Sequence, residues 1–260
     1  MIDALLELPP HVRERLAGAL ESGLLPTSPS VTALQSVLGS AESAERAGKA
    51  LAGLTAFALS GPATGAWIRS LGAVESRAPR VDLVWSGPEV PGVAARSTRR
   101  VYEELIGFAR HSLWISTYAF FDGPRAFETL ARRMDAVPGL RVTLLLNLQR
   151  KAGDTSNMDQ LVRRFADRFW SVEWPGTSHP RVYFDPRSLD LEGPGGVLHA
   201  KTVIADEEAV FVTSANLTEA ALDRNIELGL LARHRPLAAS ITAHFRGLIE
   251  REMLMLMPEA

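Results

Sequence analysis

The chain has 260 residues, of which 46% are hydrophobic, so it has enough apolar content for a packed core and is not a disordered protein. A formal net charge of −2 excludes a general attraction to polyanions, so a nucleic-acid site would have to come from local clustering of basic residues. The absence of cysteine excludes a disulfide framework and a thiolate zinc site, and it fits a reducing compartment.

The first residues carry an early acid, Asp3, and no basic flank, which is not the pattern of a signal peptide. No apolar run in the sequence approaches the ~20 residues of a membrane span. We therefore expect a cytoplasmic protein with no stable membrane association.

Residues 1–78 are rich in alanine and show no strand-like alternation, which predicts an all-α N-terminal domain. Apolar stripes predict helices over residues 10–21, 30–38 and 41–59, and Ser30 can cap the second of them. Short helices around Pro/Gly turns are typical of a helix-turn-helix, but also of any small helical bundle, which is the simpler interpretation. We assign this domain no chemistry.

After residue 78 the pattern changes to strands alternating with helices, which predicts an α/β domain over residues 79–260 with a mixed or parallel sheet flanked by helices. The predicted strands cover residues 81–85, 113–120, 142–146, 181–184, 198–205, 209–216 and 225–231. The predicted helices cover residues 98–110, 125–135, 157–170 and 237–255.

The densest group of basic residues lies around the predicted helix 157–170. It consists of Arg150, Lys151, Arg163, Arg164 and Arg168. Such a group can bind a polyanion, although a solvated helix face explains the same charges without any ligand.

The last three predicted strands carry polar residues that a buried strand normally avoids. In residues 198–205, the two-residue side-chain period places His199 and Lys201 on one face. Ser214 and Asn216, also two apart, lie at the end of the next apolar run. Glu227 lies within a third apolar run, where a carboxylate is costly to bury unless it is paired, and we expect His199 to be its partner.

These groups suit chemistry at phosphorus. A histidine can attack phosphorus directly when a carboxylate such as Glu227 holds its ring in one tautomer and stabilises the positive charge. Lys201, Ser214 and Asn216 are donors suited to the equatorial oxygens of a phosphoryl group. We expect such a site to need neither a metal ion nor a cofactor.

The same residues resemble the phospholipase D superfamily, whose signature is a His-x-Lys motif followed by an Asp five residues after the Lys. Here these residues are His199, Lys201 and Asp206, and Asp206 is expected to be structural. The family's Gly-Ser/Thr-x-Asn element is matched from residue 213 to 216, except that Thr213 stands where glycine is common. The resemblance implies a phospholipase D-like fold from about residue 81 to the C-terminus and a phosphodiesterase activity.

Each motif residue also has an ordinary interpretation. Lys201 can extend from a strand edge to solvent, Asp206 can open a hairpin turn, and Asn216 with Glu219 can cap a short helix. These interpretations do not explain why the residues occur together in the family's order, with Glu227 inside an apolar run.

Family members usually place two His-x-Lys motifs around one site, whereas this chain has one. The resemblance therefore implies a homodimer in which each chain supplies one His199. The whole arrangement is also similar to phospholipase D-like proteins of bacterial anti-phage systems, which implies a defence context with DNA-modifying or DNA-degrading neighbours and does not establish a substrate. We favour nucleic acid as substrate, DNA above RNA, with other defence proteins as partners. A phospholipid head group as substrate, or an accessory nucleic-acid-binding role with little catalysis, remain the alternatives.

Overall fold

The computed structural model describes residues 2–77, 80–191 and 195–259. The chain divides into two compact units, Met1–Ala78 and Pro79–Ala260. Each unit has its own core and is described by itself.

The N-terminal unit is all-α, as the sequence predicts. Its core is formed by buried leucines and alanines from successive helices, and the Ser30 hydroxyl caps one of them by accepting a hydrogen bond from the Ala33 N–H at 3.2 Å. Its helices are α1 (Ile2–Leu6), α2 (Pro10–Glu21), α3 (Val31–Leu38), α4 (Ala41–Leu54), η1 (Thr55–Phe57) and α5 (Gly61–Arg77).

One feature of this unit bears on membrane association. Across the described residues, no single helix has the length and apolar character to cross a membrane. The segments Ala41–Phe57 and Gly61–Val74 pass that test only as a pair, and the pair is bent by 115°.

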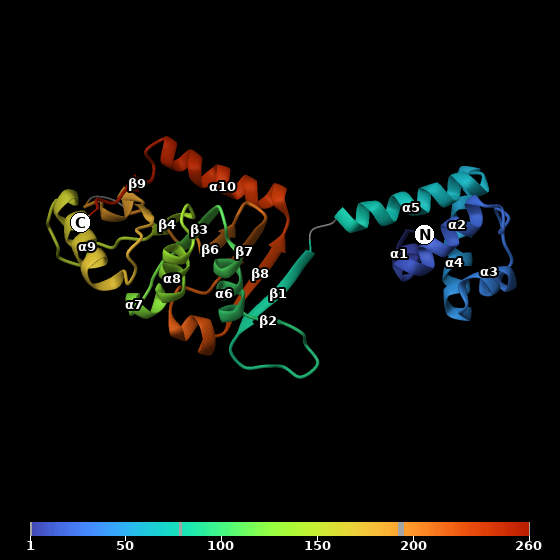
Figure 1. Ribbon diagram of the computed structural model, residues 1–260, viewed down its shortest axis with the longest axis horizontal. Coiled ribbons are helices and arrows are strands. Elements are labelled where there is room, and N and C mark those ends of the chain that lie inside the picture. Colours follow the sequence, from blue (N-terminus) through green and yellow to red (C-terminus); the bar gives the residue numbers. More distant parts are fainter. Residues whose placement is uncertain (1, 78–79, 192–194, 260) are drawn as a thin grey trace. The chain divides into compact units, whose positions relative to one another are not determined.

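The C-terminal unit contains a nine-stranded sheet with the order β2-β1-β8-β7-β6-β3-β4-β5-β9 in the described residues (Figure 1). Strands β3, β4 and β5 are parallel, whereas β6, β7, β8 and β1 are antiparallel neighbours, so the predicted mixed sheet is confirmed. The strands are β1 (Arg80–Ser86), β2 (Arg96–Ser97), β3 (Ser112–Thr117), β4 (Arg141–Leu146), β5 (Arg181–Phe184), β6 (Thr202–Ala205), β7 (Ala209–Thr213), β8 (Glu227–Arg233) and β9 (Met255–Leu256).

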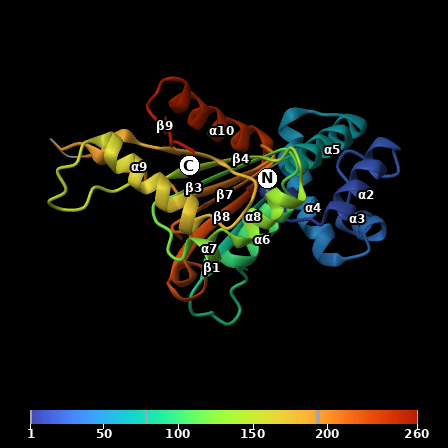
Figure 2. The same cartoon turned by 60° about the vertical axis from the view of Figure 1, so that its left-hand side comes forward.

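Helices cover both faces of this sheet (Figure 2). One face packs against α6 (Thr98–Phe108), α8 (Glu128–Ala136) and α9 (Met158–Arg168) around buried aromatic rings such as Phe127 and Phe211. The other face packs against α10 (Arg235–Glu250), where the Phe245 ring stacks on Trp114 with centroids 6.5 Å apart. The remaining short helices are α7 (Gly123–Ala126), η2 (Phe169–Glu173), η3 (Pro186–Leu189) and η4 (Ala220–Arg224).

The structure corrects the predicted strand at residues 198–205, because β6 begins only at Thr202. Leu198 and Ala200, shortly before it, form backbone hydrogen bonds with side chains instead of with a neighbouring strand. The Leu198 N–H donates to Asn147 Oδ1 at 3.1 Å, and the Ser116 hydroxyl donates to the Ala200 carbonyl at 2.8 Å. His199 and Lys201 therefore lie in an extended segment leading into the strand.

Three predicted helices also differ from the structure. The expected helix at residues 41–59 ends at Leu54 and is followed by the short turn η1. The expected helix at residues 125–135 is divided into α7 and α8, with Phe127 buried at the junction. The expected helix at residues 237–255 ends at Glu250, after which the chain returns to the sheet as β9, paired with β5.

Candidate active site

The start of β6, the end of β7 and the start of β8 meet at one edge of the sheet, because β7 is antiparallel to both of its neighbours. The Thr213 N–H donates to the Lys201 carbonyl at 3.1 Å, and the Ser214 N–H donates to the Leu228 carbonyl at 3.0 Å. Backbone pairing thus brings Lys201, Ser214 and Glu227 to the same edge, although they are far apart in sequence.

His199 and Lys201 form a close pair at this edge. The imidazole is exposed, whereas Lys201 is only 6% exposed, with its Nζ 3.2 Å from both ring nitrogens of His199 and 2.9 Å from the His199 carbonyl. Burial lowers the pKa of Lys201, and the nearby charge of Glu227 partly opposes this shift. The pair places an accessible imidazole beside a partly dehydrated ammonium.

Glu227 does not pair with His199, contrary to the expectation from sequence. The Ser214 hydroxyl donates a short hydrogen bond to Glu227 Oε2, and Asn225 Nδ2 donates to Oε1 at 3.3 Å. The sheet order explains the difference, because β7 lies between β6 and β8 and places Ser214 between the two groups. The Leu228 N–H in turn donates to Ser214 Oγ at 3.1 Å.

Asn216 lies just beyond the end of β7. Its Oδ1 accepts a hydrogen bond from the Ala119 N–H at 3.3 Å, which ties the end of β7 to the loop after β3. In the described part of the chain, this is the hydrogen bond that its side chain makes, so its Nδ2 group is the donor that remains for a ligand.

Thr213, which stands where the family commonly has glycine, keeps a β conformation at the end of β7. Its hydroxyl accepts a hydrogen bond from the Ala215 N–H at 3.0 Å. The departure therefore adds a local hydrogen bond and leaves the neighbouring Ser214 and Asn216 at the site.

Asp206 lies at the opposite end of β6, away from this edge. Its carboxylate accepts hydrogen bonds from three backbone N–H groups, those of Arg110, His111 and Ser112, each at 2.8 Å. Burial alone would raise the pKa of Asp206, but these three donors outweigh it and hold the pKa below its usual value. The turn between β6 and β7 comprises residues 206–208, in which Asp206 and Glu207 have φ of 52° and 54°.

The structure adds Tyr118 and Asn147, which the sequence analysis did not single out. The Tyr118 ring centroid lies 4.8 Å from that of His199, and its hydroxyl accepts a hydrogen bond from Gln149. Both residues follow the apolar runs of β3 and β4, and these strands end at the same edge because they are parallel. Their position directly after an apolar run is the sequence signal that could have identified Tyr118 and Asn147.

The basic cluster near α9 has structural partners. Arg150 donates to the carbonyls of Leu189, Asp154 and Ser156. Arg164 pairs with Asp154, and Arg168 pairs with Glu173. These three arginines therefore mainly stabilise the neighbouring loops.

Within the described ranges, no three His, Asp or Glu side chains are grouped so that they could bind a metal ion.

Comparisons with known proteins gave matches to one curated relative, to solved structures and to one family model. A 27% identical match over 152 residues, 58% of this chain, relates it to "DISARM protein DrmC" of Bacillus paralicheniformis, of which it spans 56%. Among solved structures, it is similar to Nuc from Salmonella typhimurium, a phospholipase D family member, with 19% identity, a TM-score of 0.45 and coverage of 70% of this chain and 99% of that chain. NucT from Helicobacter pylori gives 19% identity, a TM-score of 0.44 and coverage of 66% and 96%.

The family model described as "Cardiolipin synthase, PLD-like domain" matches residues 102–249. This range is more than half of the chain, and it contains His199, Lys201, Asp206 and Glu227. The chain therefore belongs to the phospholipase D-like family.

Proposed function

We propose that this protein is a metal-independent phosphodiesterase that cleaves nucleic acid, with DNA favoured, and that His199 is its nucleophile. The observation that carries this proposal is the exposed imidazole of His199 held beside the buried ammonium of Lys201. A buried cation next to an accessible nucleophile favours the approach of an anionic phosphodiester and stabilises the charge that develops on it.

In the proposed reaction, a ring nitrogen of His199 attacks phosphorus and the bond to the leaving oxygen breaks. A general acid gives that oxygen a proton, which leaves a phosphohistidine. Water then attacks phosphorus, the N–P bond breaks, and the former acid accepts the proton of the water. Lys201 Nζ and Asn216 Nδ2 donate to the equatorial oxygens in both steps.

Ser214 has a different role in this proposal from the one its sequence position suggested. Its proton is donated to Glu227, so it is committed to holding the carboxylate and is not free to donate to phosphate. Glu227 supplies a nearby negative charge that partly opposes the lowering of the Lys201 pKa by burial. We assign Ser214 and Glu227 to the electrostatic support of the His199–Lys201 pair.

The general acid is proposed to be His199 of a second copy of the chain, since the sequence has one His-x-Lys motif. An uncovered apolar area beside the site supports this. Val81, Leu83, Val212, Leu228 and Leu230 are 38% to 53% exposed, and they share the sheet face that α10 covers elsewhere. Together they present on the order of 400 Å² of apolar surface, as much as the largest patches of monomers, which are often functional.

The position of this area fits a two-fold dimer. Leu228 follows Glu227 directly, and Val212 is two residues before Ser214, so the patch adjoins the site. A standard interface buries about 800 Å² per partner, of which the patch supplies roughly half. A second copy seated on it would bring the two sites towards a common axis.

The activity is tested by incubating the purified chain with single- and double-stranded DNA and RNA in EDTA. We expect cleavage that the His199→Ala variant lacks. Cleavage that requires added metal, or that survives this substitution, would overturn the mechanism.

The shared site is tested by mixing wild-type protein with an excess of His199→Ala protein after subunit exchange. We expect activity to fall more steeply than the dilution of wild-type chains. Leu230→Asp should give monomers in sedimentation and lose activity, whereas Val172→Asp, at an exposed valine outside the patch, should do neither. A monomer that cleaves at the wild-type rate would show that each chain works alone.

The alternatives give different results in the same preparations. The family description names a lipid enzyme, so release of head groups from phosphatidylglycerol vesicles, without nuclease activity, would favour the phospholipid substrate. The similarity to "DISARM protein DrmC" supports a role in anti-phage defence. If His199→Ala and Lys201→Ala leave phage protection intact while deletion removes it, the accessory role is correct.

A further inference from the structure

The ten residues between Asn216 and Glu227 connect two strands that carry site residues, and they contain the π-helical turn η4. The Thr218 hydroxyl accepts a hydrogen bond from the Ala221 N–H at 3.2 Å, and the Asn225 N–H donates to the Ala220 carbonyl at 2.7 Å. Because this connection begins directly after Asn216 and ends directly before Glu227, its position affects the positions of both residues.

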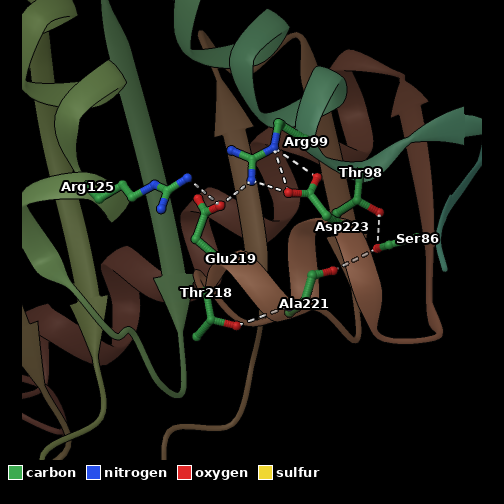
Figure 3. A network of polar contacts seen from close by, with 8 residues as sticks. All are labelled: Ser86, Thr98, Arg99, Arg125, Thr218, Glu219, Ala221 and Asp223. Carbon is green, nitrogen blue, oxygen red and sulfur yellow. Dashed lines mark hydrogen bonds and ion pairs between the residues drawn. The ribbon is translucent and has the colours of Figure 1, made fainter.

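Arg99 of α6 holds this connection through ion pairs (Figure 3). Its Nε donates to Asp223 Oδ1 at 2.9 Å, and its Nη2 donates to Glu219 Oε2 at 2.9 Å and also contacts Asp223 Oδ2. The hydrogen bond that Arg99 donates to Asp223 raises the pKa of Arg99 further, against the effect of burial, so its charge is permanent. Arg125 reaches Glu219 from the other side at 3.1 Å.

A second contact fixes the same connection from strand β1. The Ser86 hydroxyl donates to the Ala221 carbonyl at 2.7 Å and shares a hydrogen bond with Thr98 Oγ1 at 2.8 Å. Ser86 is buried and is the register partner of Glu227 across the β1–β8 pair. The anchor of the connection and the site carboxylate are therefore built on the same strand pair.

We infer that Arg99 is a positioning residue for the phosphodiester site, acting through the connection at residues 217–226. This inference rests on the proposed function. Among its contacts in the described residues, Arg99 bonds neither His199 nor Lys201, so it acts through Asn216 and Glu227. Misplacement of a reacting or supporting group by about 1 Å can cost on the order of 10²-fold in rate.

The test uses Arg99→Ala in the nucleic-acid cleavage assay. We expect kcat to fall roughly 10- to 100-fold with a smaller change in KM. Arg99→Lys should be intermediate, because lysine supplies one donor group in place of the guanidinium fork. The charge-swapped pair Arg99→Asp with Asp223→Arg should recover part of the loss.

Arg233→Ala is the matched control. Arg233 is also a partly exposed arginine with two carboxylate partners, Asp82 and Glu104, and Glu104 lies on α6 like Arg99. It lies at the far end of β8 from Glu227. We expect its loss to leave kcat unchanged, and an equal loss of activity in both variants would overturn the inference.

Amide hydrogen exchange gives a result that does not depend on activity. The Leu217 N–H donates to Thr117 Oγ1 at 3.2 Å, and the Leu228 N–H donates to Ser214 Oγ, so these two amides report on the ends of the connection. We expect both amides to exchange faster in Arg99→Ala than in the wild type, and to be unchanged in Arg233→Ala. If Arg99→Ala does not fold, Asp223→Asn takes its place and should show the same faster exchange.

The exchange rates and kcat together distinguish failure of this inference from failure of the proposed function. Unchanged exchange in Arg99→Ala would overturn the inference whatever the activity, and faster exchange with wild-type kcat would overturn the positioning role. If the wild-type chain cleaves nothing, the proposed function fails. Weaker binding of orthovanadate, a phosphate analogue, to Arg99→Ala than to Arg233→Ala would then support positioning, and equal binding would refute it.

Discussion

One sequence motif spans strand β6, with His199 and Lys201 at its start and Asp206 at its end. The charged groups at the two ends have opposite environments. At the Asp206 end, a carboxylate in the turn after β6 accepts hydrogen bonds from three backbone N–H groups just before and at the start of β3. At the other end, Lys201 is buried with a lowered pKa beside an exposed histidine. The first arrangement stabilises the fold, and the second places a buried ammonium beside an exposed imidazole, where we propose that the phosphodiester binds. The difference separates structural from chemical roles within one motif.

The largest effect should follow from removing His199. His199→Ala should reduce cleavage to background, a loss beyond about 10⁴-fold, because both the nucleophile and the partner's general acid disappear. Its unfolding midpoint should stay near that of the wild type, since the ring is exposed. Rates from a quenched cleavage assay, with circular dichroism melts alongside, check both statements, and substantial residual cleavage would contradict the assignment.

Asp206→Ala should act mainly on stability, whereas His199→Ala acts on cleavage. We expect it to lower the free energy of unfolding by about 2–4 kcal/mol, because three donors lose a charged acceptor. The lowered pKa means that this contribution is present above about pH 4 and is lost as pH falls through the folded-state value. Urea unfolding at pH 7 and pH 3 measures it, and an equal loss at both pH values would show that the charge plays no part.

Glu227→Gln tests whether Glu227 supports Lys201 through its charge. The charge that supports Lys201 is lost while the shape is kept, so kcat should fall about 10- to 100-fold with the fold intact. Ser214→Ala should resemble it, since Ser214 holds the carboxylate. A Ser214→Ala variant that instead raises KM alone would return Ser214 to phosphate binding.

The smallest effect concerns the cost of burying Lys201. Its pKa is lower in the folded chain, so the unfolded chain binds more protons above that value and stability rises with pH there. Lys201→Met should remove this cost and raise the free energy of unfolding at pH 7 by about 1 kcal/mol, while abolishing cleavage. A destabilised Lys201→Met variant would mean that the ammonium's hydrogen bonds outweigh its burial.

Much of the site could be predicted from the sequence, because apolar runs mark strands and polar residues at their ends stand out. His199, Lys201 and Glu227 were singled out in this way, and the structure places them at one edge of the sheet, where their role stays a prediction. The mixed sheet was predicted from the same pattern and is confirmed. The partner of Glu227 was not, because hydrogen bonding across the site depends on strand order, and β7 separates β8 from β6.

Other features are non-local for similar reasons. Tyr118 and Asn147 reach the site only because β3 and β4 are parallel, which a single run of sequence does not reveal. Strand β9 has two residues, too few to form a pattern, and is defined by its pairing with β5. Strand β6 begins later than the sequence predicted because the Leu198 N–H donates to the Asn147 side chain and the Ala200 carbonyl accepts from the Ser116 hydroxyl.

The most direct test of the phosphohistidine mechanism is the stereochemical course at phosphorus. Each in-line displacement inverts the phosphorus centre, so attack by His199 followed by attack by water gives net retention. The measurement uses an oligonucleotide with one chiral phosphorothioate, cleaved in ¹⁸O-labelled water with EDTA present. The mechanism predicts retention of configuration, and inversion would show that water attacks directly and that His199 forms no covalent intermediate.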